Sequence, residues 1–254
     1  MALFDTHAHL LSEQFDDDRA ALIERLPSLG LEGVIEIGTT VDDSLSAAAL
    51  AAKTNYIYAA VGVHPHEAKD APPDYLEQLE ALASQPKVVA VGEIGLDYHY
   101  DFSPRDVQQR VFSAQLALAM RLGLPVAIHM REATQDTLAI LREFSGITGV
   151  MHCYSGSPET AEMLVAMGLC VSFTGSVTFK NARKTVESAA VVPLNRIMAE
   201  TDCPYLSPEP MRGRRNDPSN VRHVLQKLAD IKGLSFEEMC RINIENAKGL
   251  YRIK

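Results

Sequence analysis

Short apolar runs recur along the chain at intervals of about 20 to 40 residues. Most are rich in valine and isoleucine and end at glycine or a polar residue, which is typical of buried strands. Because such short runs also fit buried helix, the segments between them have to support the assignment. The predicted strands span residues 3–4, 33–37, 57–63, 88–91, 125–128, 149–151, 169–173 and 196–199.

Helical patterns fill the segments between these runs. Ser103-Pro104 gives a start signal for one helix, and Gly123 gives its stop. Pro27 is expected to end or bend the first helix. The predicted helices span residues 17–29, 43–54, 74–84, 105–122, 133–144, 157–167, 183–190, 220–231 and 235–250.

Alternation of strand and helix indicates the α/β class, with a parallel sheet covered by helices. Eight such units in 254 residues favour a closed (β/α)8 TIM barrel over an open doubly wound sheet. We expect residues 1–254 to form a single domain. The stretch 203–219 is too long and too proline-rich to be a connecting loop without a function.

Composition narrows the class of protein. The chain has 24 Lys and Arg against 33 Asp and Glu, a net charge of −9, with 46% hydrophobic residues. This hydrophobic content excludes a disordered or collagen-like chain. The negative charge argues against a broad surface that binds nucleic acid and against binding to a membrane surface. Neither GxGxxG nor GxxxxGK[ST] occurs, so no nucleotide cofactor is expected.

The expected location is cytoplasmic. No apolar run approaches the ~18 residues that span a bilayer, and the start of the chain lacks the basic region of a secretory signal. No two cysteines form a C-x-x-C pair, so reduced thiols are the simplest interpretation. No interface signature stands out, and we expect a monomer.

Histidines and carboxylates follow several of the predicted strands. Because the carboxyl ends of barrel strands meet at one mouth, where active sites form, we expect these residues to lie together. They are His7, His9, Glu93, His129, His152 and Asp202.

Each of these residues taken alone has a structural explanation. His129 or His152 alone would be a hydrogen-bonded core histidine, Asp202 a helix N-cap and Glu93 an ion-pair partner. Burying them together is costly unless a cation satisfies them all. The joint pattern therefore predicts a metal site.

Two metal ions fit these residues better than one, since a single catalytic zinc usually takes three protein ligands. His7 and His9 alternate along an extended strand and point the same way, so one ion can take both. The first ion would bind His7, His9 and Asp202, the second His129 and His152, and Glu93 would bridge them. Zinc, manganese or nickel suits this set, and magnesium is less favoured.

Seven blocks in order resemble the TatD family of metal-dependent deoxyribonucleases, which have an amidohydrolase-like barrel. The resemblance runs from Phe4 to about Gly249. It implies hydrolysis of DNA phosphodiester bonds, often as a 3′–5′ exonuclease, and the same two ligand sets, with Glu93 shared between them. The blocks are FDTHAHL (4–10), GVHPH (62–66), GEIGLDYH (92–99), PVAIHMREA (125–133), HCYSG (152–156), ETDCPYL (200–206) and RGRRNDPSNV (212–221).

A mechanism follows as a hypothesis, with Asp202 and Glu93 as the catalytic residues. A water activated by the metals would attack phosphorus, and Asp202 would orient it and take its proton. We expect the partner to be DNA, held by a few nucleotides at a single-stranded or frayed 3′ end. The predicted substrate contacts are His64, Arg131, Arg212, Arg214 and Arg215.

These substrate contacts have alternatives. The arginines would otherwise form a solvated charge run, and His64 would orient a metal ligand. Residues 98–102 include three aromatic rings, which would stack an exposed base or pack over the barrel mouth.

Two other functions remain open. A small-molecule amidohydrolase (an amidase, lactonase or deaminase) would use the same barrel, but such enzymes commonly bridge their metals with a carbamylated lysine where this chain has Glu93. A catalytically silent scaffold would have no physical reason to keep six costly polar groups at one mouth.

Overall fold

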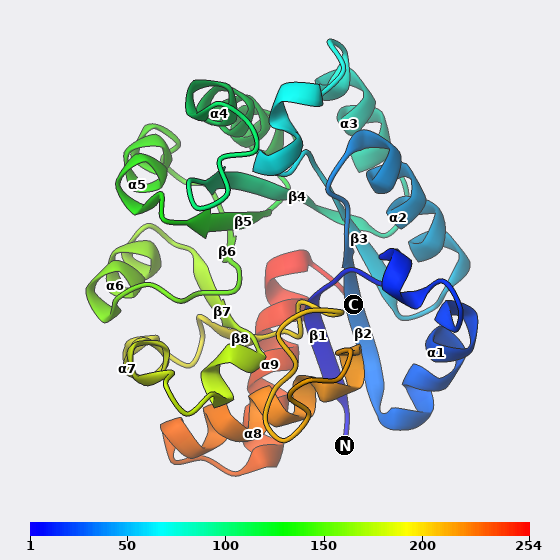
Figure 1. Ribbon diagram of the computed structural model, residues 1–254, viewed down its shortest axis with the longest axis vertical. Coiled ribbons are helices and arrows are strands. Elements are labelled where there is room, and N and C mark those ends of the chain that lie inside the picture. The colour runs from blue at the N-terminus through cyan, green and yellow to red at the C-terminus, as the bar shows by residue number, and fades with distance from the viewer.

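The computed structural model describes residues 1–254 and contains one eight-stranded sheet. The strands lie side by side in chain order and are all parallel. The predicted (β/α)8 barrel is confirmed and is nearly closed (Figure 1). The strands are β1 (Leu3–Ala8), β2 (Leu31–Ile37), β3 (Ile57–Val61), β4 (Val88–Asp97), β5 (Val126–Arg131), β6 (Gly149–Met151), β7 (Cys170–Phe173) and β8 (Ile197–Ala199).

Helices surround these strands in Figure 1. They are α1 (Arg19–Arg25), α2 (Val41–Lys53), α3 (Tyr75–Ala83), α4 (Arg105–Leu122), α5 (Thr134–Glu143), α6 (Pro158–Ala166), α7 (Arg183–Val191), α8 (Val221–Lys232) and α9 (Phe236–Tyr251). Five 3₁₀ turns are η1 (Glu13–Phe15), η2 (Leu26–Leu29), η3 (Pro65–Asp70), η4 (Gly175–Thr178) and η5 (Pro218–Asn220). None of the helices combines the length and the apolar composition needed to cross a bilayer.

Two helices end where a proline or a glycine predicts. The first helix ends at Arg25, and a 3₁₀ turn containing Pro27 follows. The long helix α4 ends at Gly123, whose φ of 65° is left-handed and favours glycine.

The barrel closes between β1 and β8, where regular pairing is sparse. The backbone N–H of Asp202 donates to His7 O at 2.9 Å, and that of His9 donates to Cys203 O at 2.9 Å. Nearer the other end of the same two strands, the side chain of Asn243 in α9 donates to Phe4 O of β1 and accepts from Ala199 N of β8, each at 2.8 Å. This closure places the segment after β8 against the end of β1.

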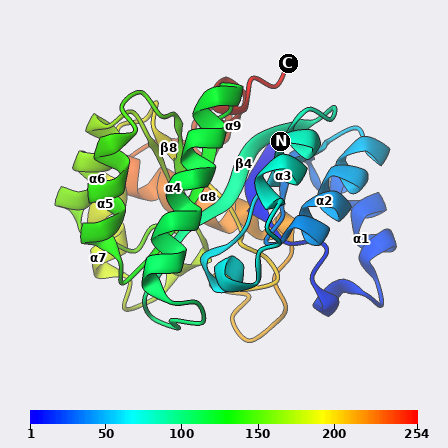
Figure 2. The ribbon, with the colours of Figure 1, turned by 90° about the horizontal axis from the view of Figure 1, so that it is seen from above.

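The interior of the barrel is apolar at one end. Phe4, Ala90 and Met198 from the strands pack with Ala247 and Tyr251 of α9 in one buried cluster. In Figure 2, α9 and the loop that follows β8 lie at opposite ends of the molecule. Because α9 covers one end, the carboxyl ends of the strands form the open mouth.

Three strands extend farther at their carboxyl ends than their apolar runs predict. β1 continues to Ala8, β4 to Asp97 and β5 to Arg131. The expectation that His7, Glu93 and His129 follow the strands is therefore wrong, since all three lie within them. The physical reason is that backbone pairing continues after the side chains become polar, and apolar periodicity does not detect that part of a strand.

Candidate metal centre

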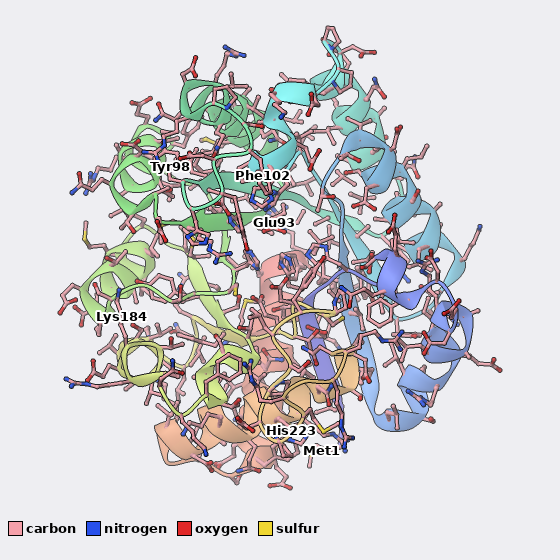
Figure 3. All side chains as sticks on the ribbon, viewed as in Figure 1. Met1, Glu93, Tyr98, Phe102, Lys184 and His223 are labelled. Carbon is pink, nitrogen blue, oxygen red and sulfur yellow. The ribbon has the colours of Figure 1, made fainter.

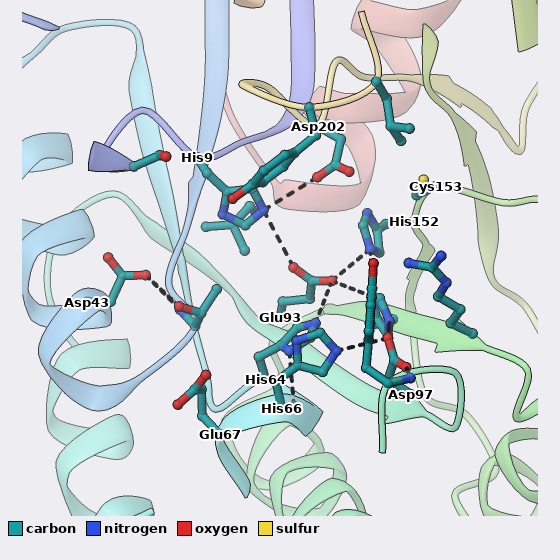
Figure 4. A pocket seen from close by; sticks show the side chains of 18 of the residues that line it. His9, Asp43, His64, His66, Glu67, Glu93, Asp97, His152, Cys153 and Asp202 are labelled. Atoms are coloured by element: carbon teal, nitrogen blue, oxygen red, sulfur yellow. Dashed lines mark hydrogen bonds and ion pairs between the residues drawn. The ribbon is translucent and has the colours of Figure 1, made fainter. Parts of the chain in front are cut away.

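All six predicted ligands converge at the barrel mouth, where the other five lie around Glu93. Figure 4 shows Glu93 at the centre, with His9 and Asp202 on one side and His64 on the other. His7 and Glu93 are only 1% and 2% exposed. A cavity of about 780 Å³ opens above them, and its walls include His9, His64, Glu93, His129, His152 and Asp202.

One group of ligand atoms lies between β1, β4 and the end of β8. It consists of Nε2 of His7, Nε2 of His9, Oε2 of Glu93 and Oδ1 of Asp202. The two imidazole nitrogens are 3.2 Å apart, and they lie 3.3–3.7 Å from the two carboxylate oxygens.

This spacing fits a metal ion. Ligand atoms about 2.1 Å from a four-coordinate ion lie about 3.4 Å from one another. Imidazole nitrogens and carboxylate oxygens are also the donor types that borderline divalent cations prefer. The side chains present are therefore consistent with a bound divalent cation.

A second group surrounds the other oxygen of Glu93. Its Oε1 lies 2.7 Å from Nε2 of His152, 2.8 Å from Nδ1 of His129 and 3.5 Å from Nε2 of His64. The nitrogens of His129 and His152 are 3.3 Å apart. The two oxygens of Glu93 thus face two different groups of ligands, as a bridging carboxylate requires.

Electrostatics keeps Glu93 ionised in this buried position. Burial by itself raises the pKa of a carboxyl group, but the charged imidazole of His152 and a hydrogen bond from His129 hold the pKa of Glu93 well below its ordinary value. Burial conversely lowers the pKa of His64 to about 4, so this imidazole is neutral at pH 7. Nδ1 of this neutral ring accepts from the backbone N–H of His66 at 3.1 Å, so Nε2 carries the proton and can donate a hydrogen bond.

Asp202 lies on strained backbone, with a left-handed φ of 55°. Cys153, which follows the proposed ligand His152, shares this conformation with a φ of 45°. Non-glycine residues rarely adopt it, and such strain often clusters at functional sites. Although burial opposes the shift, a hydrogen bond from His9 and nearby imidazoles lower the pKa of Asp202. This aspartate is therefore a carboxylate at neutral pH.

Sequence reasoning missed Asp97, which orients His129. Its Oδ2 lies 3.0 Å from Nε2 of His129 and 3.0 Å from Nε2 of His66. The carboxylate fixes the ring so that Nδ1 of His129 faces Glu93, the usual arrangement behind a metal-bound histidine. The sequence did contain a pattern that could have identified Asp97. Glu93, Gly95 and Asp97 are alternate residues of one strand, so their side chains share one face.

Glu200 supports His152 in the same way and was also missed. Its Oε1 lies 3.4 Å from Nδ1 of His152 and accepts from the backbone N–H of Cys153 at 2.6 Å. Its other oxygen accepts from Ser172 Oγ at 2.5 Å. Glu200 directly precedes Thr201-Asp202, but nothing in that sequence indicates which way its side chain turns.

The predicted substrate contacts fall into two groups. His64 and Arg131 line the cavity. The three arginines after β8 do not line it: Arg215 forms an ion pair with Asp18 at 2.6 Å, and Arg212 lies over the ring of Phe179. No ion pair is found for Arg214, whose side chain is exposed.

The barrel and its convergent imidazole and carboxylate groups define the class of protein as a metal-dependent hydrolase. The family model "TatD related DNase" matches residues 4–252. The chain therefore belongs to the TatD family, which confirms the resemblance seen in its sequence motifs.

Relatives support the same assignment. The chain is 45% identical over 253 residues to the "Uncharacterized metal-dependent hydrolase YabD" of Bacillus subtilis (strain 168), covering 99% of each chain. It is 35% identical to the "3'-5' ssDNA/RNA exonuclease TatD" of Pectobacterium parmentieri (strain WPP163), covering 99% of this chain and 100% of that one. The crystal structure of YJJV, a TatD homologue from Escherichia coli K12, matches with a TM-score of 0.93 and 30% identity over 99% of this chain and 98% of that chain.

Proposed function

We propose that residues 1–254 act as one catalytic domain, a monomer, that removes nucleotides from the 3′ end of single-stranded DNA by hydrolysis with two divalent cations. The observation that carries the proposal is the position of Glu93, whose two oxygens face two separate groups of ligands at the floor of one cavity. Support for the substrate comes from the relative named as a 3'-5' ssDNA/RNA exonuclease, at 35% identity.

The proposed metal ligands are the six predicted residues, and His64, whose Nε2 also lies 3.5 Å from Glu93, is assigned to the substrate. His7, His9 and Asp202 would hold one ion, His129 and His152 the other, and Glu93 both. When bound, such a pair lowers the pKa of a water and neutralises charge on the attacking and leaving oxygens of a phosphodiester. Zinc, manganese, nickel and magnesium are the candidates, and the mixed imidazole and carboxylate donors favour the first three.

Residues around the ligands are placed to handle protons and phosphate. The Asp202 carboxylate borders the cavity, so it can orient an attacking water and accept its proton. His64 is neutral and lies beside Glu93, where it can hydrogen-bond a phosphate oxygen or the leaving oxygen. Arg131 supplies the positive charge at the cavity wall.

The three arginines after β8 would lie farther from the reacting phosphate. Since Arg212, Arg214 and Arg215 do not line the cavity, they would contact nucleotides farther from the reacting phosphate. Arg215 would have to leave Asp18 to do so.

The test is digestion of 5′-labelled single-stranded DNA, with each candidate metal supplied in turn, by the wild type and by Glu93→Ala and His129→Ala. Stepwise shortening from the 3′ end that both variants lose by at least about 100-fold is the expected result. Blocking the 3′ end with a terminal phosphorothioate linkage should stop the shortening at its first step.

The competing function is hydrolysis of small amides or lactones on the same centre. Metal-loaded wild type that leaves DNA intact but cleaves members of an amide and lactone panel would replace the nuclease proposal. RNA substrates in the same assay test whether the 2′-hydroxyl is tolerated, since both nucleic acids share the phosphodiester.

A further inference from the structure

Two aromatic side chains stand exposed beside the mouth of the barrel. Tyr100 is 48% and Phe102 is 56% exposed, although large apolar side chains are mostly buried in this protein. Their rings stack on each other, with centroids 5.2 Å apart and planes inclined by 22°. Both belong to the loop after β4, the strand that carries Glu93; Figure 3 labels Phe102 and Glu93.

This pair is continuous with the metal centre. The ring of His66 lies 4.8 Å from that of Phe102, 5.4 Å from that of Tyr100 and 6.2 Å from that of His129. Tyr100 and His66 are both part of the cavity wall. A molecule whose phosphate reached the ligands would therefore pass Tyr100, on which Phe102 is stacked.

A cation lies over one of these two rings, that of Tyr100. The guanidinium of Arg131 is 4.8 Å from the centroid of Tyr100 and also lines the cavity. It is the only lysine or arginine in the cavity wall. In a chain of net charge −9, few positive groups are available at the mouth to hold an anionic strand, so contact with the uncharged bases gains importance.

The loop that carries the rings is held rigidly from beneath. Asp97 Oδ1 accepts from the backbone N–H groups of His99 and Tyr100 at 3.0 and 2.9 Å. At the other end of the loop, Ser103 Oγ donates to His66 O at 2.8 Å, and Gln108 donates to Ser103 O at 2.8 Å. Such anchoring lowers the ordering cost of binding, because the rings are already placed.

We propose that stacked Tyr100 and Phe102 form the platform on which a nucleobase next to the scissile phosphate stacks, with Arg131 contacting the backbone of the same nucleotide. This inference rests on the proposed nuclease function and names the subsite that selects its substrate. Stacking is tolerant of base identity, because every base has an aromatic face. The platform therefore selects nucleotides that carry a base over bare sugar-phosphate.

The first test compares kcat/KM for two oligonucleotides that differ only at the last two 3′ positions, which carry either normal or abasic nucleotides. Wild type should prefer the normal strand by about tenfold or more. Tyr100→Ala and Phe102→Ala should lose that preference mainly through KM, while Tyr100→Phe and Phe102→Tyr should keep it. Met120→Ala is the matched control, since Met120 is 44% exposed on α4 and lies outside the cavity wall.

The second test measures stacking without cleavage. The probe is a single-stranded oligonucleotide with phosphorothioate terminal linkages and 2-aminopurine at one of its last two positions, mixed with metal-loaded protein. Quenching of the probe on binding to wild type, lost in the alanine variants and retained in the aromatic ones, is the expected result. Quenching that is equal in wild type and Tyr100→Ala, or an alanine variant with an unchanged preference for bases, overturns the platform.

These outcomes separate the platform from the proposed function. Binding and quenching without DNA cleavage would support the platform and reject the hydrolytic reaction. Cleavage with no base preference would reject the platform alone, and absence of binding would reject both. A dimer that sedimentation velocity detects for wild type but not for Tyr100→Ala, with quenching unchanged, would assign the rings to a protein interface instead.

Discussion

Glu93 illustrates how one residue can organise a site. A carboxylate that is 2% exposed would be strongly destabilising without compensation. Here five imidazoles surround it, two toward Oε2 and three toward Oε1. The arrangement leaves several nitrogens and oxygens facing one another at 3.2–3.7 Å, which is poor packing for the bare side chains and suitable spacing for ligands of a cation.

Asp202→Asn tests the proposed proton acceptor. The amide keeps an oxygen at nearly the same place but cannot accept a proton from water at neutral pH. We expect kcat on single-stranded DNA to fall by about 10²- to 10⁴-fold. Bound metal, measured by mass spectrometry of the desalted protein, should fall far less. Near-normal turnover in this variant would remove Asp202 from the proposed role.

Glu36 supplies a test of pH dependence that is measured as stability, because this carboxyl of the cavity wall takes no part in the proposed reaction. The backbone N–H groups of Leu10 and Leu11 donate to its carboxyl at 2.8 and 3.0 Å. Burial nevertheless raises the pKa of Glu36 from 4.5 to about 7. Because the folded-state pKa is raised, the contribution of this group to stability is fully present below pH 4.5 and is lost as pH rises through about 7.

The variant Glu36→Gln cannot titrate and isolates this effect. In metal-free protein, the Tm of the variant minus the Tm of wild type should increase as pH rises from about 5 to about 8. Circular dichroism melts at four pH values measure the difference. A constant difference across this range would show that Glu36 does not titrate there.

At the scale of elements, β4 and β5 position the centre together. Gly95 pairs with His129 across these strands and has a φ of 148°, which L side chains rarely adopt. A Cβ built there would lie 1.9 Å from His129 O, so a side chain must push the two strands apart. The close approach brings Glu93 and His129 within 2.8 Å of each other.

Gly95→Ala should therefore harm both stability and the site. We expect the free energy of unfolding to fall by about 3 kcal/mol or more, because the strain adds to the clash with backbone. Gly123→Ala is the control, since its φ of 65° is also left-handed but a Cβ there meets nothing within 4 Å. That change should cost only about 1–2 kcal/mol. Equal losses in urea unfolding of the two variants would contradict the argument.

Across the whole molecule, metal binding and folding should be coupled. The ligands come from β4, β5, β1 with the residue after it, and the segments after β6 and β8, so only the closed barrel assembles them. A ligand at 100 times its dissociation constant stabilises the folded state by about 2.7 kcal/mol. Removal of metal by EDTA should lower the Tm by about 5–10 °C, and manganese or zinc should restore it. His129→Ala should show a smaller shift, and an unchanged Tm in wild type would argue against bound metal in the centre.

The barrel and the chemical types in its mouth were determined by the sequence alone. Strand periodicity, the alternation with helices and breakers such as Pro27 and Gly123 are local properties, so short segments carry them. Ligand types are likewise visible as residues, which is why His7, Glu93 and Asp202 could be named before their distances were known.

Only the tertiary structure decided how these groups meet. It directs one oxygen of Glu93 toward His9 and the other toward His152, turns Asp97 behind His129, and draws Arg215 away to Asp18. These partners lie up to 197 positions apart in the chain. The physical reason is that closure of the barrel sets the distances between strands, and side-chain rotation within that frame decides which atoms face the cavity, neither of which is contained in a local pattern.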